Sequence, residues 1–183
     1  MFNTLYSAIL RNAKEKRQLL VAIDGRAASG KTTLAAALDK ALSQDFHTAV
    51  IHTDDFYLPR ERHDYEKLGG NMDFDRLRGL LEEVKRNGAA TYRPFLCREQ
   101  RLGEAVRVEG AEVILVEGSY SLHASLFPLY DLTFCLTVDP EEQRARIIKR
   151  EGERAEAFFT RWIPLEEKHF ADLKERGFSF LSL

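Results

Sequence analysis

Residues 25–32 read Gly25-Arg26-Ala27-Ala28-Ser29-Gly30-Lys31-Thr32 and fit the phosphate-binding pattern G-x-x-x-x-G-K-[ST] without a mismatch. A short apolar run, 19–23, precedes this stretch and is typical of a buried parallel strand. A segment rich in strong helix formers, 33–42, follows it. Strand, glycine loop and helix in this order are the context that separates a true phosphate-binding loop (P-loop) from a chance glycine turn. The stretch therefore predicts binding of a nucleoside triphosphate.

The chemistry of the predicted loop follows from its backbone and two side chains. Gly25 and Gly30 lack a Cβ atom, so the chain can curl its N–H groups around an anion, and the following helix adds its positive end. Lys31 is expected to reach the β- and γ-phosphates, and the Thr32 hydroxyl is expected to ligate Mg²⁺. The residues predicted to bind ATP here are Gly25, Ala27, Ala28, Ser29, Gly30, Lys31, Thr32 and Thr33.

Strand-like and helix-like segments alternate along the rest of the chain. The predicted strands are 19–23, 49–52, 113–116, 132–138 and 178–181, and the predicted helices are 4–17, 33–42, 74–86, 140–150 and 164–175. Residues 92–108 are expected to form an inserted β-hairpin, and about 146–161 a lid. This pattern predicts a three-layer α/β/α P-loop NTPase fold with a mostly parallel sheet of about five strands, in one domain over 1–183.

Composition and charge narrow the function classes. The chain has 183 residues, 44% hydrophobic and 31% charged, with 27 Lys and Arg against 29 Asp and Glu. The net charge of −2 argues against a general nucleic-acid binder. We expect a cytoplasmic protein with no membrane association, since no signal peptide or membrane-length apolar stretch is evident. Cys97 and Cys135 are far apart and suggest neither a disulfide framework nor a metal site.

Acidic residues follow two of the predicted strands, at the sheet edge where ligands collect. Asp54 and Asp55 follow the second strand, and either could be the base in phosphoryl transfer or only a loop or helix-cap carboxylate. Glu117 ends the third strand, as the acid of a Walker B element does near Mg²⁺, or is simply a solvated strand-end acid. Because parallel strands end together, we expect these acids to meet the P-loop.

Basic and aromatic residues supply the remaining candidates. Arginines recur at helical spacing from Arg144 to Arg154, either as a lid over the transferred phosphate or as an ion-paired surface. Aromatic residues gather around the insertion and could line an acceptor pocket or pack in the core. They are Phe56, Tyr57, Tyr65, Phe74, Tyr92 and Phe95.

Four elements in this order resemble the uridine kinase family: residues 25–33, Thr53-Asp54-Asp55-Phe56-Tyr57, Asn71-Met72-Asp73-Phe74-Asp75 and Glu117-Gly118. The wider group includes nicotinamide riboside kinase, pantothenate kinase and phosphoribulokinase, and the resemblance spans roughly 19–165. It implies that Asp54 is the catalytic base, that Asp73 binds ribose hydroxyls and that Glu117 and Thr32 hold Mg²⁺. It also implies that Tyr92, with Tyr57 and Phe95, contacts the acceptor. Lys31 and Arg150 would then be catalytic, with Arg146 and Arg154 on the ATP phosphates.

One position departs from the family. Uridine kinases have a histidine that recognises the pyrimidine where this chain has Cys97, so the acceptor stays open. The leading hypothesis is an ATP- and Mg²⁺-dependent kinase of a nucleoside-like hydroxyl metabolite, acting as a monomer or homo-oligomer. The alternatives are a kinase of nicotinamide riboside, pantothenate or a sugar, and an ATP-dependent switch or assembly factor without a small acceptor. A nucleic-acid end kinase is disfavoured by the charge.

Overall fold

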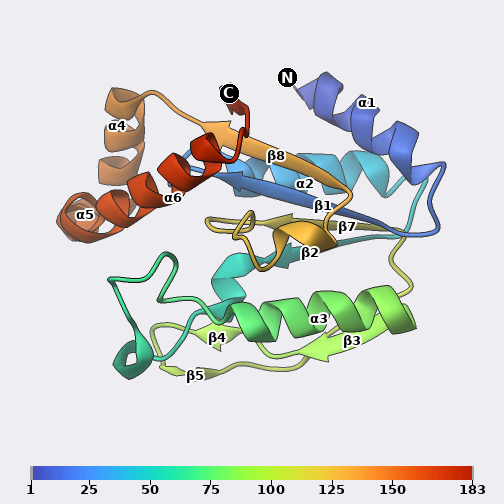
Figure 1. Ribbon diagram of the computed structural model, residues 1–183, viewed down its shortest axis with the longest axis horizontal. Coiled ribbons are helices and arrows are strands. Elements are labelled where there is room, and N and C mark those ends of the chain that lie inside the picture. Colours follow the sequence, from blue (N-terminus) through green and yellow to red (C-terminus); the bar gives the residue numbers. More distant parts are fainter. Residues whose placement is uncertain (1, 183) are drawn as a thin grey trace.

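The computed structural model describes residues 2–182 and has a parallel sheet at its centre (Figure 1). Its strands are β1 (Leu19–Gly25), β2 (Thr48–His52), β7 (Val113–Glu117), β8 (Leu132–Thr137) and β9 (Phe180–Ser182). They lie in the order β2-β7-β1-β8-β9, and every neighbouring pair is parallel. The predicted sheet of about five strands is confirmed. Its carboxyl edge faces the end of the molecule where the last helices lie (Figure 1).

Helices cover both faces of this sheet. Successive residues of a strand point to opposite faces, so a strand of apolar residues needs a covering layer on each side. In β1 every residue is buried, and Leu19 and Val21 pack against α1 (Phe2–Ala13) and α2 (Lys31–Leu42). Leu20 packs on the other face against α3 (Phe74–Asn87), and Ala22 packs there against α6 (Ile163–Glu175). The three-layer α/β/α prediction is confirmed.

Two element boundaries, the end of the first helix and the start of the inserted β-structure, differ from the predicted ones. The first helix ends at Ala13 instead of residue 17, because 14–17 are all charged, exposed and without an apolar side chain to bury. The helix α3 ends at Asn87, and the following Gly88 adopts the left-handed conformation, φ 73°, that commonly caps a helix. That turn sends the chain directly into a strand, so the inserted β-structure begins at Ala89 instead of Tyr92.

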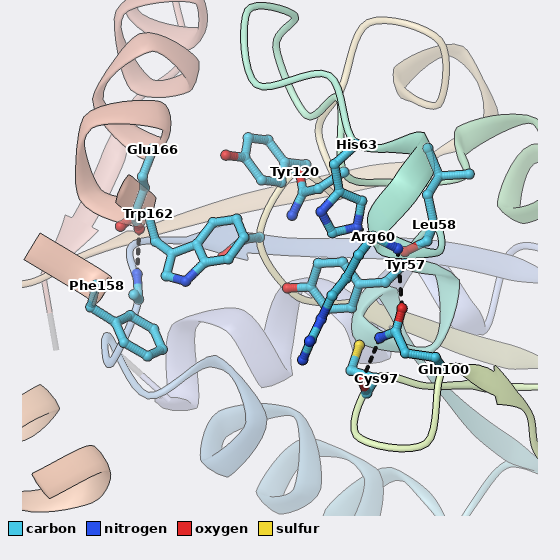
Figure 2. Close-up of a pocket in the computed structure, with 13 residues that line it drawn as sticks. Tyr57, Leu58, Arg60, His63, Cys97, Gln100, Tyr120, Phe158, Trp162 and Glu166 are labelled. Atoms are coloured by element: carbon cyan, nitrogen blue, oxygen red, sulfur yellow. Dashed lines mark hydrogen bonds between the residues drawn. The ribbon is translucent and has the colours of Figure 1, made fainter. Parts of the chain in front are cut away.

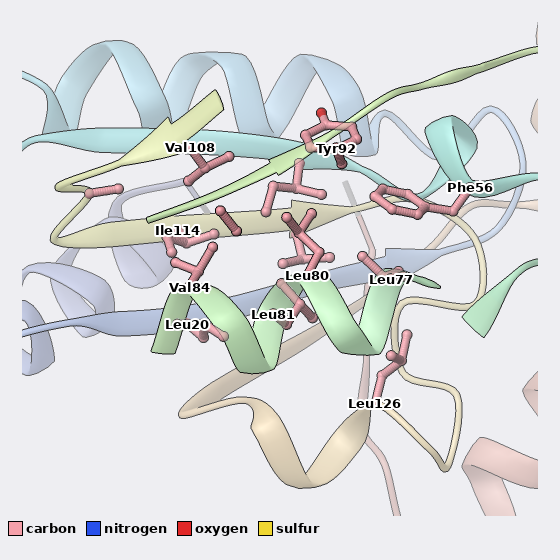
Figure 3. Close-up of a cluster of buried hydrophobic side chains, with 14 of the residues drawn as sticks. Leu20, Phe56, Leu77, Leu80, Leu81, Val84, Tyr92, Val108, Ile114 and Leu126 are labelled. Carbon is pink, nitrogen blue, oxygen red and sulfur yellow. The ribbon is translucent and has the colours of Figure 1, made fainter. Parts of the chain in front are cut away.

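The insertion forms two successive antiparallel pairs. β3 (Ala89–Tyr92) pairs with β6 (Val106–Glu109), and β4 (Phe95–Leu96) pairs with β5 (Arg101–Leu102). Together with α3 it encloses a cluster of buried apolar side chains against the sheet, drawn in Figure 3. The insertion thus packs on the framework through a core that it shares with α3 and with the strands β1, β2 and β7.

The segment from α4 to α6 lies at the carboxyl edge of the sheet (Figure 1). α4 (Pro140–Glu151) begins as predicted, with Asp139 accepting hydrogen bonds from the N–H groups of Glu141 and Glu142. After it come a 3₁₀ turn (Gly152–Arg154), α5 (Ala155–Ala157) and a π-helical turn (Phe158–Trp162) that leads into α6. Three further 3₁₀ turns span Thr53–Phe56, Arg60–Arg62 and Phe127–Leu129. Within residues 2–182, no helix has the length and apolarity needed to cross a membrane.

Gly118 makes a backbone approach that no other residue type can make, and replacing it should destabilise the fold. Its φ is +137°, and a Cβ atom there would lie 2.0 Å from Oγ1 of Thr53. That hydroxyl also donates a hydrogen bond to the Ser119 carbonyl, 3.1 Å away. We expect Gly118→Ala to lower the free energy of unfolding by about 2–4 kcal/mol, measured by urea denaturation.

Gly79 provides the matched control. It lies exposed within α3, and a Cβ atom there would meet nothing within 4 Å. Gly79→Ala should therefore stabilise the protein by about 0.5–1 kcal/mol through helix propensity. Equal effects of the two substitutions would contradict the strain assigned to Gly118.

Candidate active site

The P-loop lies between β1 and α2 in the conformation expected of an anion-binding turn. Gly25 ends the strand with φ 154°, and a Cβ atom there would be 2.6 Å from the Leu136 carbonyl oxygen. Ala28 and Gly30 both adopt left-handed conformations, with φ of 58° and 92°. Lys31, the first residue of α2, donates hydrogen bonds to the carbonyl oxygens of Gly25 and Arg26 at 2.8 and 2.9 Å. A backbone of this kind can direct N–H groups toward an anion, and the start of α2 adds its positive end.

A cavity of about 580 Å³ opens in front of this loop, and we call it the phosphate-loop cavity. Loop residues, two strand-end acids and two arginines line it, and most of the predicted ATP-binding residues are among them. Its lining includes Ala27, Ala28, Gly30, Lys31, Thr32, Thr33, Asp54, Tyr57, Glu117, Arg146 and Arg150. Gly25 and Ser29 are not among its lining residues; Ser29 is fully buried inside the loop.

Three elements meet at the Glu117 carboxylate. Its Oε1 accepts a hydrogen bond from the Thr32 hydroxyl at 3.0 Å and lies 2.6 Å from Nδ1 of His52. The hydrogen bond to Glu117 raises the pKa of His52, and partial burial of the imidazole opposes the rise. Oε2 of Glu117 is buried and has no hydrogen-bond partner within the described part of the chain. Hydroxyl and carboxylate oxygens side by side, one of them unpaired, fit a hard divalent cation such as Mg²⁺.

The two adjacent aspartates after β2 have different surroundings. Asp54 lines the phosphate-loop cavity and accepts a hydrogen bond from the Tyr57 hydroxyl at 3.2 Å. Although its carboxylate reaches the cavity, the surrounding protein displaces water and raises the pKa of Asp54, while Lys31 opposes this shift. Asp55 accepts a hydrogen bond from the Tyr92 hydroxyl at 2.9 Å and is not part of the cavity lining. Of the two, Asp54 is the carboxylate beside the P-loop.

The arginines of the predicted lid divide into two sets. Arg146 donates a hydrogen bond to the Ala28 carbonyl at 3.0 Å, and Arg150 donates one to Glu151 at 2.9 Å. Both line the phosphate-loop cavity, where their positive charges would attract the negative charge of a polyphosphate. Arg154 lies 3.7 Å from Glu151, is exposed, and lines neither this cavity nor the one described next. Its predicted contact with ATP stays a prediction.

A second cavity, of about 300 Å³, adjoins the first, and we call it the aromatic cavity (Figure 2). Figure 2 shows that its walls come from distant parts of the chain: the segment after β2, the β4–β5 turn, the loop after β7, and the π-helical turn with the start of α6. The two cavities share Ala27, Tyr57, Ser119 and Phe158. The aromatic cavity is further lined by Leu58, Arg60, His63, Asn71, Cys97, Gln100, Tyr120, Trp162 and Glu166. A molecule bound here would lie directly beside the P-loop.

The predicted acceptor residues do not all line this cavity. Tyr57 does, whereas Asp73 caps α3 by accepting a hydrogen bond from the Arg76 N–H at 3.1 Å. Tyr92 and Phe95 are buried and lie outside the linings of both cavities, with the Tyr92 ring stacked on Phe56 at 5.1 Å. The roles of these three in acceptor binding stay predictions.

Several lining residues were missed by the sequence reasoning, because their spacing carries no pattern. Glu166 is 4% exposed although its helix reads as ordinary and amphipathic. Its carboxylate accepts a hydrogen bond from the Ala27 N–H of the P-loop, and its Oε2 lies 3.4 Å from Nε2 of Gln143. Trp162 lies between the predicted lid and the predicted helix 164–175, and Arg60 lies outside every predicted helix and strand. The burial of an acidic residue 139 positions after its partner is visible only in three dimensions.

A buried hydrogen-bond network holds α6 against the sheet. Oδ2 of Asp24, the residue before the P-loop, lies 2.8 Å from Nε2 of His169, and both side chains are at most 1% exposed. The same carboxylate accepts hydrogen bonds from the N–H groups of Gly25 and Leu122. The Tyr120 ring packs on His169 with centroids 4.9 Å apart. One carboxylate therefore connects the P-loop, the loop after β7 and the helix that carries Glu166.

Glu166 is expected to make the protein less stable as the pH rises toward neutrality. Burial raises the pKa of its carboxyl from 4.5 to about 7, with Lys31 opposing the rise. Between these values the folded protein holds a proton that the unfolded chain has released, so the free energy of unfolding falls as the pH rises. Glu166→Gln removes this titration. From pH 5 to pH 8 the variant should gain about 2 kcal/mol relative to the wild type in urea denaturation.

Glu175→Gln on the same helix is the control, because Glu175 is exposed. Its stability relative to the wild type should be the same at both pH values. If Glu166→Gln also gave a pH-independent difference, the Glu166 carboxyl would not titrate as inferred.

Comparisons with known proteins find similarity to uridine kinases. No protein-family model matches the sequence. Uridine-cytidine kinase D of Dictyostelium discoideum is 27% identical over 133 residues, which is 70% of this chain and 25% of that protein. Uridine kinase of Mycoplasma genitalium is 26% identical over 151 residues, which is 76% of this chain and 70% of that protein. The chain therefore corresponds to a quarter of the length of the first relative and to most of the second.

A solved structure extends the likeness across the whole fold. A possible uridine kinase from Bacillus stearothermophilus superposes with a TM-score of 0.76 at 20% identity, covering 99% of this chain and 97% of that one. This likeness shows that the chain has the three-layer α/β/α P-loop fold of that structure. In sequence, the chain is similar to the two uridine kinase relatives described above.

Proposed function

We propose that this chain transfers the γ-phosphoryl group of ATP to a hydroxyl group of a small, nucleoside-like acceptor. The observation that carries the proposal is the position of Asp54. It lines the phosphate-loop cavity and is hydrogen-bonded to Tyr57, which lines both that cavity and the aromatic cavity. A carboxylate at this junction is within reach of a hydroxyl that enters from the aromatic cavity toward a phosphate on the P-loop.

The donor half of the proposed site holds the triphosphate by charge and backbone amides. Lys31, Arg146 and Arg150 all line the phosphate-loop cavity. Phosphoryl transfer needs little covalent chemistry from the protein, because positioning and charge stabilisation supply most of the rate. We assign to Lys31 and Arg150 the stabilisation of charge on the transferred group. Arg146, anchored on the Ala28 carbonyl, would orient the phosphates over the loop.

The acceptor half supplies the base and excludes water. Asp54 would accept the proton of the attacking hydroxyl, and Tyr57 would hold the carboxylate in place through its hydrogen bond. Lys31 stabilises the ionised form of Asp54 and keeps it able to accept a proton. The rings of Tyr57, Tyr120, Phe158 and Trp162 give the aromatic cavity walls suited to a planar or apolar part of the acceptor.

The residues present fit Mg²⁺, which ATP-dependent phosphoryl transfer requires. Thr32 and Glu117 would hold it, since their oxygens lie 3.0 Å apart and Oε2 of Glu117 has no partner among residues 2–182. The cation, when bound, neutralises charge on the β- and γ-phosphates.

ADP release with a panel of acceptors tests the proposal. The purified chain with ATP and MgCl₂ should release ADP at least about tenfold faster in the presence of its acceptor than alone. The panel comprises uridine, cytidine, nicotinamide riboside, pantothenate and ribose, and product is identified by mass spectrometry. A rate that no member of the panel raises would reject the proposal, and stimulation by a protein partner instead would favour an ATP-dependent switch.

A further inference from the structure

The aromatic cavity contains one acidic side chain among the 13 residues that line it, and that residue is Glu166. In Figure 2 it lies on the same side as Phe158 and Trp162, opposite Arg60 and Gln100. Its hydrogen bond to the Ala27 N–H places it at the P-loop end of the cavity, since Ala27 lines both cavities. Glu166 therefore lies at the end of the aromatic cavity that Ala27 lines, beside the P-loop.

The Glu166 carboxylate has unused capacity to accept hydrogen bonds. Above its pKa of about 7, the ionised Glu166 carboxylate offers about four lone-pair positions. Among the described residues it uses one for Ala27, and its other oxygen has a long contact, 3.4 Å, with Gln143. A buried carboxylate whose remaining positions open on a cavity is best satisfied by hydroxyl or amine donors of a ligand.

Asp73, the carboxylate that the family resemblance assigns to ribose hydroxyls, is occupied elsewhere. Its Oδ1 accepts the hydrogen bond that caps α3, and its Oδ2 lies 4.0 Å from the Arg76 guanidinium. It is absent from the linings of both cavities, within the residues that the structure describes. Glu166 therefore lines the aromatic cavity, where an acceptor would fit, and Asp73 does not.

We propose that Glu166 is the residue that selects the acceptor, by binding hydroxyl groups adjacent to the one that is phosphorylated. The inference rests on the proposed function. It assigns the acceptor to the polyhydroxylated, sugar-bearing class and places its diol at the P-loop end of the cavity. A carboxylate-bearing acceptor with its charge at this end is disfavoured, because it would bring two like charges together in a site shielded from water. The head group of the acceptor would lie toward Arg60 and Gln100.

Binding measurements test this assignment without relying on turnover. Uridine, cytidine and nicotinamide riboside are each titrated by calorimetry against the protein with Mg²⁺ and a non-hydrolysable ATP analogue, alongside their 2′,3′-dideoxy counterparts. The wild type should bind at least one riboside about 10- to 100-fold more tightly than its dideoxy counterpart. Glu166→Gln should reduce that preference to less than about threefold while leaving the affinity for the ATP analogue undiminished.

Matched variants distinguish the role of Glu166 from those of Glu175 and Asp73. Glu175→Gln, at an exposed position of the same helix, should keep the full preference for the riboside. Glu166→Asp, which retains the charge on a shorter side chain, should retain part of it and guards against misfolding of the glutamine variant. The proposal is overturned if Asp73→Asn abolishes the preference, if Glu166→Gln preserves it, or if the wild type binds no riboside more tightly than its counterpart.

The outcome is distinguishable from the fate of the proposed function. Riboside binding that depends on Glu166 without acceptor-dependent ADP release would reject the kinase proposal alone. Acceptor-dependent ADP release with an unchanged acceptor KM in Glu166→Gln would reject the role of Glu166 alone.

Discussion

Asp54→Asn is expected to lower kcat by about 10²–10⁴-fold while binding of Mg²⁺ and ATP is retained. The substitution keeps the size of the side chain and its hydrogen bond to Tyr57 but removes the group that accepts the proton of the acceptor hydroxyl. Since the side chain of Asp54 is hydrogen-bonded to Tyr57, outside the P-loop, the nucleotide affinity should change little. Steady-state turnover and titration with an ATP analogue measure the two effects separately.

Asp55→Asn is the control for this experiment. Asp55 differs from its neighbour by one position in the chain, and its carboxylate accepts a hydrogen bond from Tyr92 instead of lining the cavity. We expect a loss of turnover below about tenfold, arising from a weaker contact with the insertion. Comparable losses in the two variants, or full activity in Asp54→Asn, would show that Asp54 is not the base.

Lys31→Ala is expected to lower kcat by about 10²–10³-fold and to weaken ATP binding as well. Lys31 is 9% exposed and is the cation at the start of α2, where the phosphate-loop cavity meets the P-loop. Its ammonium group donates to the carbonyl oxygens of Gly25 and Arg26, so the side chain is held beside the phosphate position. Calorimetric titration with ATP and steady-state turnover provide the measurement.

Lys40→Ala on the same helix is the comparison, because Lys40 lies in the last turn of α2, away from the loop. It should leave both turnover and ATP affinity unchanged. Thermal unfolding of both variants shows whether loss of the two Lys31 hydrogen bonds disturbs the P-loop itself. ATP affinity in Lys31→Ala equal to that of the wild type would contradict the assignment.

Much of the framework was predictable because it depends on local pattern. The apolar run before Gly25 forms β1, and the Asp139-Pro140 pair begins α4 as capping chemistry requires. The α3 cap at Gly88 follows from the same local rules. Boundaries failed where tertiary packing decides, as at the end of α1 and the start of β3. Periodicity locates a buried face but does not say where the partner surface ends.

The acceptor side of the site was less predictable, for a physical reason. Tyr92 and Phe95 are aromatic residues in the expected insertion, yet packing beneath it buries both outside the cavities. Glu166 reads as an ordinary helical glutamate until α6 is placed against the P-loop. Which side chains line a cavity depends on contacts among distant segments, and a single sequence carries no local signal for them.

The sequence by itself determined the P-loop, the parallel framework around it and the acids at the strand ends. These follow from glycine conformation, strand burial and the common edge at which parallel strands finish. Only the tertiary structure decided which of two adjacent aspartates faces the loop, and that Glu166 is buried beside Ala27. Both outcomes depend on how the 3₁₀ turn after β2 and the helix α6 pack on the sheet, and such long-range packing is set by the whole core.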